Sequence, residues 1–210
     1  MPRLREALAT ADFDRLPAGA VLLLNSQGGD GMAAIELGRM VRAAKAQVFV
    51  RGRCASACVF ILAAGVVRGA PDRAVGIHRP RLTTFVKDIG VVDINPSSNP
   101  NAAKALEIAD RRTAEYLRDM GMPDALYKAM MATPSDQSRL LSAEELREFG
   151  LAGIEPAYAE AQAANVALRY KASPPEYVQR APQVQDKCLT PKATGAEFVR
   201  CYNRVLRMGE

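Results

Sequence analysis

The sequence predicts an α/β fold with a mainly parallel sheet, because strand-like and helix-like segments alternate along its first half. Short runs of apolar and β-branched residues, typical of strands covered on both faces, alternate with segments whose apolar residues recur at helical spacing. Strand–helix–strand units of this kind form parallel sheets with right-handed crossovers. The expected order is a strand at Val21–Asn25, a helix at Met32–Lys45, a strand at Gln47–Val50, a helix at Ala55–Ala64 and a strand at Ala74–Ile77.

The second half is expected to be mainly helical. The segment 80–101 shows no regular pattern and contains several prolines, serines and asparagines, so we expect a loop or an unpaired arm there. Ser142 and Glu145 have the spacing of a capping box, which predicts the start of a short helix. The expected helices of this part are Ala102–Met120, Met122–Met131 and Ser142–Phe149.

We expect two units, an α/β domain over residues 1–154 and a helical, proline-containing extension over residues 155–210. The domain is expected to open with a short helix at Leu4–Leu16. The extension is expected to hold a helix at Ala157–Tyr170, a linker with three prolines and a final amphipathic helix at Ala196–Arg207.

Composition bounds the function. The 210 residues are 49% hydrophobic and 24% charged, which is ordinary for a globular protein. The net charge of +5 comes from scattered basic residues without interleaved aromatics, which argues against a nucleic-acid surface. The longest apolar stretch, Ala55–Val67, is shorter than the roughly 20 residues of a membrane span. A single histidine and the lack of a C-x-x-C motif argue against a zinc site.

Four cysteines permit two disulfides. Cys54 and Cys58 are four residues apart, and in a helical turn their Cα atoms would lie about 6 Å apart, within the range of a disulfide. Cys188 and Cys201 lie close together in the C-terminal tail. The alternative is four reduced thiols in a cytoplasmic protein, with Cys54 and Cys58 as small buried hydrophobes.

Ser56 and His78 are the candidate catalytic residues. Ser56 stands at a strand-to-helix junction, and the chain's only histidine, His78, ends the next expected strand. A serine and a histidine are the minimum parts of a nucleophile–base pair. The alternatives are that Ser56 caps the helix, that His78 is structural, and that the Cys54 thiol is the nucleophile. Upstream, Gly28 and Gly29 would let the backbone approach a substrate closely.

Three motifs in order resemble the proteolytic subunit of the Clp protease. Residues 52–65 read GRCASACVFILAAG, followed by IHRP at 77–80. Upstream, LNSQGG at 24–29 resembles the family's "NSPGG" element, and downstream LSAE at 141–144 with FGL at 149–151 resembles its "LSA…YGL" segment. The similarity covers Val21–Ile154, about two-thirds of the chain. The pattern Cys54-Ala-Ser-Ala-Cys58 is more similar to the secreted ClpP-like proteins of bacteria.

The resemblance implies a ClpP/crotonase-like fold of stacked βαβ units and a serine peptidase without metal or cofactor. It makes Ser56 the nucleophile and His78 the base, and it assigns the oxyanion hole to the N–H groups of Gly28 and Ala57. The substrate would be a peptide or protein. The family's helical handle packs between subunits, and the apolar faces of the helices over 102–131 lead us to expect a homo-oligomer.

The acid of the triad is where the sequence departs from the family. Ser138 stands at the position of the family's aspartate, and Asp136 lies two residues earlier. We therefore expect the His78 imidazole to contact Asp136, a backbone carbonyl or water. A serine–lysine dyad with Lys87 or Lys104 is a further alternative.

The resemblance favours a periplasmic or secreted protein, with an additional strand and an export signal upstream of Met1; a cytoplasmic protein is the alternative. Two other functions stay open. The first is a catalytically silent ClpP-fold module that binds extended peptides along a strand edge. The second is a crotonase-type enzyme that holds the enolate of an acyl-CoA with two backbone N–H groups and needs no serine.

Overall fold

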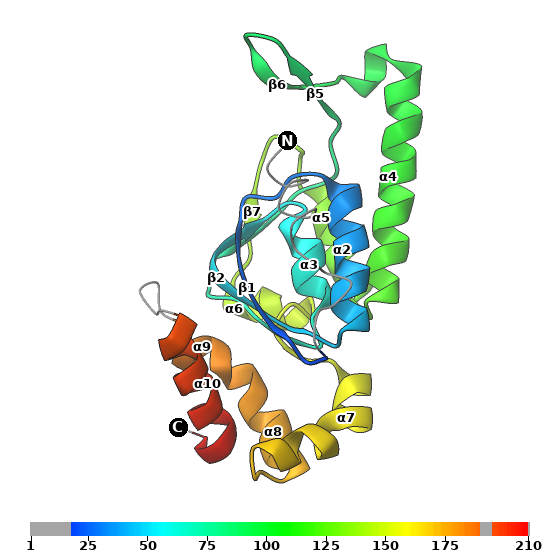
Figure 1. The fold of residues 1–210 in the computed structure, drawn as a ribbon. Coiled ribbons are helices and arrows are strands. Elements are labelled where there is room, and N and C mark those ends of the chain that lie inside the picture. Colours follow the sequence, from blue (N-terminus) through cyan, green and yellow to red (C-terminus); the bar gives the residue numbers. More distant parts are fainter. Residues whose placement is uncertain (1–17, 190–194, 210) are drawn as a thin grey trace.

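The computed structural model describes residues 18–189 and 195–209 and has a mixed α/β architecture around a mostly parallel sheet (Figure 1). This confirms the predicted α/β class with a mainly parallel sheet. The helix expected at Leu4–Leu16 and the additional N-terminal strand lie outside the described residues. The sheet has the strand order β7-β4-β2-β3-β8, with β1 also paired to β2. Its strands are β1 Val21–Ser26, β2 Gln47–Ala55, β3 Val67–Gly69, β4 Val75–Ile77, β7 Arg139–Leu140 and β8 Gly153–Ile154.

Strand β2 is longer than predicted and organises the sheet. It pairs in parallel with β1 along one edge, and with β3 and then β4 along the other. The register against β1 shifts between Leu24 and Ser26, which marks an irregularity of the bulge type. The prediction that the strand ends at Val50 was wrong, because β2 passes this irregularity and continues against β4. Helix α3 (Cys58–Ala64) consequently begins later than expected.

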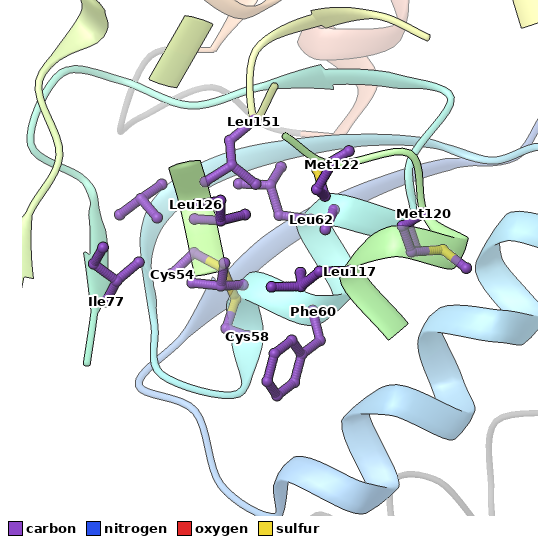
Figure 2. Packing of buried hydrophobic residues seen from close by; sticks show 14 of the residues in the cluster. Cys54, Cys58, Phe60, Leu62, Ile77, Leu117, Met120, Met122, Leu126 and Leu151 are labelled. Carbon is purple, nitrogen blue, oxygen red and sulfur yellow. A yellow bond between two sulfur atoms is a disulfide. The ribbon is translucent and has the colours of Figure 1, made fainter. Parts of the chain in front are cut away.

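Four helices pack together beside the sheet in Figure 1: α2 Gly31–Ala43, α3, α4 Pro100–Asp119 and α5 Asp124–Ala132. The side chain of Asp30 accepts the N–H groups of Met32 and Ala33 and so caps α2. The main core lies between these helices and the sheet (Figure 2). Helix α4 is fastened to it by the Tyr116 hydroxyl, which donates to the Phe60 carbonyl oxygen at 2.7 Å.

The capping-box prediction is confirmed at helix α6 (Ala143–Glu148). The Ser142 hydroxyl accepts the Glu145 N–H, and the Glu145 carboxylate accepts the Ser142 N–H. The two side chains thereby satisfy free donors of the first turn and set the direction in which the chain leaves β7.

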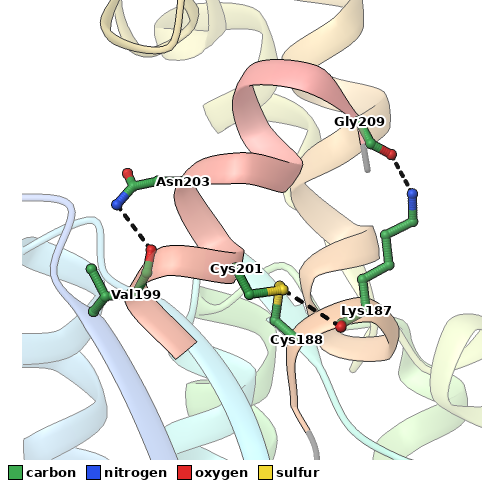
Figure 3. Close-up of a disulfide and its surroundings, with 6 residues drawn as sticks. All are labelled: Lys187, Cys188, Val199, Cys201, Asn203 and Gly209. Carbon is green, nitrogen blue, oxygen red and sulfur yellow. Dashed lines mark hydrogen bonds between the residues drawn. A yellow bond between two sulfur atoms is a disulfide. The ribbon is translucent and has the colours of Figure 1, made fainter. Parts of the chain in front are cut away.

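The C-terminal helices bury the sheet through a second core. These helices are α7 Pro156–Arg169, α8 Pro174–Arg180, α9 Val184–Cys188 and α10 Gly195–Met208. They pack Tyr177, Phe198 and Leu206 around Phe49 of β2 and Val67 of β3. The disulfide Cys188–Cys201 joins α9 to α10 (Figure 3), as predicted.

The proline-containing linker expected within this extension was a wrong prediction. Residues 174–188 are helical, because two prolines occupy the first turn of α8 and Ser173 forms a capping box with Glu176. The proline at position 182 lies in the short 3-10 helix Ala181–Gln183.

The expected arm over residues 80–101 is a β-hairpin followed by a short helix. Strands β5 (Thr83–Val86) and β6 (Gly90–Asp93) pair antiparallel, and the 3-10 helix η2 (Pro96–Ser98) leads into α4. The hairpin projects away from the sheet in Figure 1. Its base is closed by an ion pair between Arg81 and Asp93 at 3.4 Å.

The apolar faces that suggested a homo-oligomer are largely covered by this chain. Tyr116 and Leu117 of α4 and Leu126 and Met130 of α5 are buried in the main core. The burial of these faces within one chain removes the argument from the faces, and the homo-oligomer stays a prediction. Among the described residues, no helix combines the length and the apolar character needed to cross a bilayer.

Two arginines hold the ends of three helices beside the sheet. Arg42 donates to the carbonyl oxygens of Ala64, at the end of α3, and of Met120, at the end of α4. Arg68 of β3 donates to the carbonyl oxygens of Gly65 and of Gly150, the latter just beyond α6. Burial lowers the pKa of Arg68 to about 9, so its guanidinium is still charged at neutral pH.

We expect the substitution Arg68→Met to lower the free energy of unfolding by about 2–4 kcal/mol, because it leaves a buried and a partly buried helix-end carbonyl without a donor. Arg39 is the matched control: it pairs with Asp119 at the surface, with 59% of its side chain exposed. Arg39→Met should change stability by less than about 1 kcal/mol. Urea unfolding in non-reducing buffer measures both values, and equal effects would contradict the capping role of Arg68.

Candidate active site

Ser56 occupies a strained turn between β2 and α3. Its φ is +55°, in the left-handed region that a residue other than glycine rarely adopts. Its N–H donates to the Gly76 carbonyl oxygen at 2.9 Å, which fastens the turn to β4. The residue that precedes α3 is Ala57, without a side-chain cap, so the structure gives Ser56 no capping role. A strained backbone that serves no cap is typical of functional positions.

A disulfide spans this turn, as the cysteine spacing predicted. Cys54, near the end of β2, is bonded to Cys58, the first residue of α3, with their Cα atoms 5.2 Å apart (Figure 2). Both cysteines are buried in the main core. The bridge holds the two ends of the turn that presents Ser56. Because Cys54 is consumed in the bridge, it has no thiolate to offer as a nucleophile.

The glycine turn after β1 lies directly against Ser56. A β-carbon on Gly28, whose φ is +99°, would lie 2.7 Å from the Ser56 Cβ and 3.1 Å from the Ala57 nitrogen, so only glycine fits there. Within the described chain the Ala57 N–H donates to no other group, whereas the Gly28 N–H donates to the Ser26 hydroxyl at 3.1 Å. The two expected oxyanion-hole residues are thus neighbours. The Ala57 N–H is free to bind an oxyanion, whereas the Gly28 N–H is already bonded to the Ser26 hydroxyl.

His78 follows β4 at the same edge of the sheet. Ala55 pairs with Gly76 in parallel, so Ser56 and His78 both come just after paired strand ends. No hydrogen bond joins Ser56 to His78 in the structure, although both residues lie in the described range. Nδ1 of His78 lies 2.8 Å from the Arg79 carbonyl oxygen. Because a carbonyl only accepts, we assign the proton to Nδ1, which leaves Nε2 as the basic nitrogen.

The Arg79 carbonyl is one of the partners that we expected for His78. Strand β7 pairs antiparallel with β4, and the Ile77–Arg139 pair places Ser138 opposite His78 one step further along the register. The Ser138 Oγ would lie 2.5 Å from a β-carbon on Gly76, so this hydroxyl packs tightly on β4. Asp136 is exposed, and the structure, which describes both residues, shows no hydrogen bond between it and His78.

The two lysines considered for a dyad lie elsewhere. Lys87 is exposed in the turn of the β5–β6 hairpin, and Lys104 is exposed in the first turns of α4. Both belong to the part of the molecule that projects from the sheet (Figure 1). The structure does not bring either lysine to Ser56 through any contact among the described residues.

One charged residue beside this edge was missed by the sequence reasoning. Asp110 of α4 lines a cavity together with Arg79, the residue after His78. Burial raises the pKa of the Asp110 carboxyl, and the positive charge of Arg79 partly opposes this shift. Nothing in the helical pattern distinguishes Asp110 from the other acidic residues of α4, so only the folded chain reveals it. No cluster of three or more metal-ligating side chains occurs in the described ranges.

A scan against protein-family models finds no match, and a search of curated proteins finds no similar sequence. The assignment of a function therefore rests on the geometry at the ends of β1, β2 and β4.

If the site hydrolyses esters, we expect Asp136→Asn to change the rate by less than about threefold, because Asp136 makes no hydrogen bond to the imidazole. The loss of a true triad aspartate costs about 10⁴ in turnover. The measurement is kcat for an activated ester, with Ser138→Asp assayed in parallel because its carboxylate would face His78. If Asp136→Asn removes activity, Asp136 is the acid and it reaches His78 in a conformation other than this one.

Proposed function

We propose that the protein is a serine hydrolase, a peptidase similar to the Clp proteolytic subunit, and that its fold is of the ClpP/crotonase type. The observation that carries the proposal is the left-handed, disulfide-bridged turn at Ser56, packed on Gly28 and adjacent to the strand end that bears His78. A backbone strained in this way presents a serine side chain outside the regular strand and helix, as a nucleophile requires.

The reaction would follow the acyl-enzyme route. The Ser56 Oγ attacks the carbonyl carbon of the substrate, and Nε2 of His78 takes the hydroxyl proton. The oxyanion accepts the open N–H of Ala57 and the N–H of Gly28, which must first exchange the Ser26 hydroxyl for the substrate. His78 then gives its proton to the leaving amine or alcohol. A water molecule attacks the acyl-serine, His78 takes the proton of that water, and the carboxylic acid leaves as the Ser56 hydroxyl is restored.

The partner of His78 sets the expected speed. The Arg79 carbonyl orients the ring and selects its tautomer, as a triad aspartate does, but it brings no full negative charge to the imidazolium. A site with this arrangement should hydrolyse activated esters readily and amides slowly. We therefore propose a slow hydrolase whose histidine is oriented by the backbone.

The two disulfides are consistent with an oxidising compartment, and we propose a periplasmic or secreted protein on that basis. The α/β domain of residues 1–154 would carry the site, and the extension of residues 155–210 would cover the sheet.

A homo-oligomer is proposed only through the projecting hairpin, because an isolated two-stranded hairpin is marginally stable in water. A monomer in sedimentation at micromolar concentration would contradict it.

A catalytically silent peptide-binding module is the second candidate. The Ser26 hydroxyl on the Gly28 N–H and the missing contact between Ser56 and His78 favour it, because both describe a site that is not assembled for reaction. A crotonase-type enzyme would need both N–H groups but no serine, so its activity should survive the loss of the Ser56 hydroxyl.

The deciding experiment is labelling with a fluorophosphonate probe, which reacts with activated serines. We expect the wild-type protein to be labelled and Ser56→Ala to be unlabelled and at least about 10³-fold slower with an activated ester. Ser97→Ala, at an exposed serine of η2, is the matched control and should label as the wild type does. Wild-type protein that resists the probe would support the silent module, and ester hydrolysis that survives Ser56→Ala would support the crotonase type.

The bridge at the active-site turn should matter for reactivity more than for stability. We expect the double substitution Cys54→Ala and Cys58→Ala to slow labelling at least tenfold, because the turn relaxes from its strained conformation, while its short loop contributes little denatured-state entropy. The matched pair Cys188→Ala and Cys201→Ala opens a loop with a sequence separation of 13. It should cost about 3 kcal/mol of unfolding free energy with labelling unchanged. Equal labelling by both variants would show that the Cys54–Cys58 bridge does not hold the turn.

A further inference from the structure

Arg79, the residue that follows His78, lines a cavity of about 270 Å³. It lies between α4, the base of the β5–β6 hairpin and the segment that follows α5. This volume suits one long side chain and lies just below the usual range for whole small-molecule ligands. Its apolar lining comes from Pro80, Leu82, Ile94, Pro96, Leu106 and Met131.

One carboxylate in this cavity has an oxygen without a hydrogen-bond donor among the described residues. Arg81 and Asp93 pair with each other at 3.4 Å, so their charges largely cancel. Asp110 keeps its Oδ1 atom buried without a hydrogen bond from any residue that the structure describes. Arg79 lines the same cavity and its charge partly offsets that of Asp110, but it donates no hydrogen bond to this oxygen. A buried acceptor without a donor is costly, and a ligand that brings a donor relieves that cost.

We propose that this cavity is a specificity pocket for a lysine or arginine side chain of the substrate, with Asp110 as the residue that recognises the cation. The proposal rests on the hydrolase function proposed above and adds the class of substrate to it. The aliphatic stem of the side chain would lie along the apolar lining, and its ammonium or guanidinium group would donate to the carboxylate of Asp110. Because Arg79 directly follows His78 and lines this cavity, a substrate bound at Ser56 would have the pocket within reach of one of its side chains.

Two other occupants are less well matched. An apolar side chain would fill the volume but would leave the Asp110 acceptor without a partner and exclude water from it. A substrate carboxylate could pair with Arg79, but it would meet the like charge of Asp110 in the same cavity. Both occupants are outcomes of the test.

The first arm of the test measures hydrolysis in non-reducing buffer. The substrates are matched p-nitrophenyl esters of acylated lysine, norleucine and glutamate, since norleucine keeps an aliphatic stem without the charge. We expect a lysine-to-norleucine ratio in kcat/KM of at least about tenfold for the wild type, the typical worth of one charge-assisted hydrogen bond. The ratio should fall to about one in Asp110→Asn. Glu107→Gln, at an exposed acid one turn earlier on α4, should keep the wild-type ratio.

The second arm measures binding without chemistry. Ser56→Ala protein is titrated into dye-labelled pentapeptides that differ only in lysine or norleucine, and fluorescence anisotropy reports the dissociation constants. Tighter binding of the lysine peptide that disappears in Ser56→Ala/Asp110→Asn supports the pocket, even if the wild type hydrolyses nothing. The absence of hydrolysis would then contradict the hydrolase proposal alone.

Three results overturn the pocket, and the first two do so whether or not the protein is a hydrolase. The first is equal treatment of lysine and norleucine in both arms. The second is a preference for glutamate that Arg79→Gln abolishes. The third is that none of these peptides binds and, at the same time, none of the esters is hydrolysed.

Discussion

The parallel pairing of β2 on both of its edges is the interaction on which the rest of the structure depends. β1 lies along one edge of β2, and β3 and β4 share the other, so the carboxyl ends of β1, β2 and β4 meet at one end of the sheet. Ligands of open α/β sheets bind at such carboxyl ends. Gly28, Ser56 and His78 each follow one of these three strands, and the pairing therefore assembles the candidate site before any side chain contributes.

The strain at Ser56 is held in place by covalent and tertiary constraints. A non-glycine residue in the left-handed region costs about 1–3 kcal/mol, so the surrounding structure must over-determine it. Here the Cys54–Cys58 bridge joins the two flanking elements, and the hydrogen bond from the Ser56 N–H to the Gly76 carbonyl fastens the turn to β4. Because both sulfurs are buried in the main core, the same packing that stabilises α3 also fixes the turn.

Apolar runs and caps were readable from the sequence, whereas features that depend on tertiary partners were not. Strand β1 and the capping box of α6 follow from local patterns. Strand β3 was missed because Val67 continues the apolar run of α3, and periodicity cannot divide such a run. The β5–β6 hairpin lacks a typical two-residue turn signal, because three residues (87–89) separate its strands. One of them, Asp88, has a φ of +66°. The motifs indicated Ser56 and His78, but Asp110 acquires its position only when α4 folds over the hairpin base.

In the proposed hydrolase, the backbone partner of His78 would decide which bonds the site could break. The Arg79 carbonyl holds the imidazole in one tautomer. The side chain of the same residue is positively charged, and a positive charge does not favour an imidazolium. An amide needs that imidazolium, because its leaving nitrogen must be protonated before the bond breaks. An activated ester releases an alkoxide or phenolate that leaves without a proton, so it makes a smaller demand on His78. For a polypeptide substrate, the lowering of the barrier that a triad aspartate would give must therefore come from another interaction with the substrate. The Asp110 pocket is the place where it could, since energy gained in binding a remote side chain can be used to orient the reacting bond.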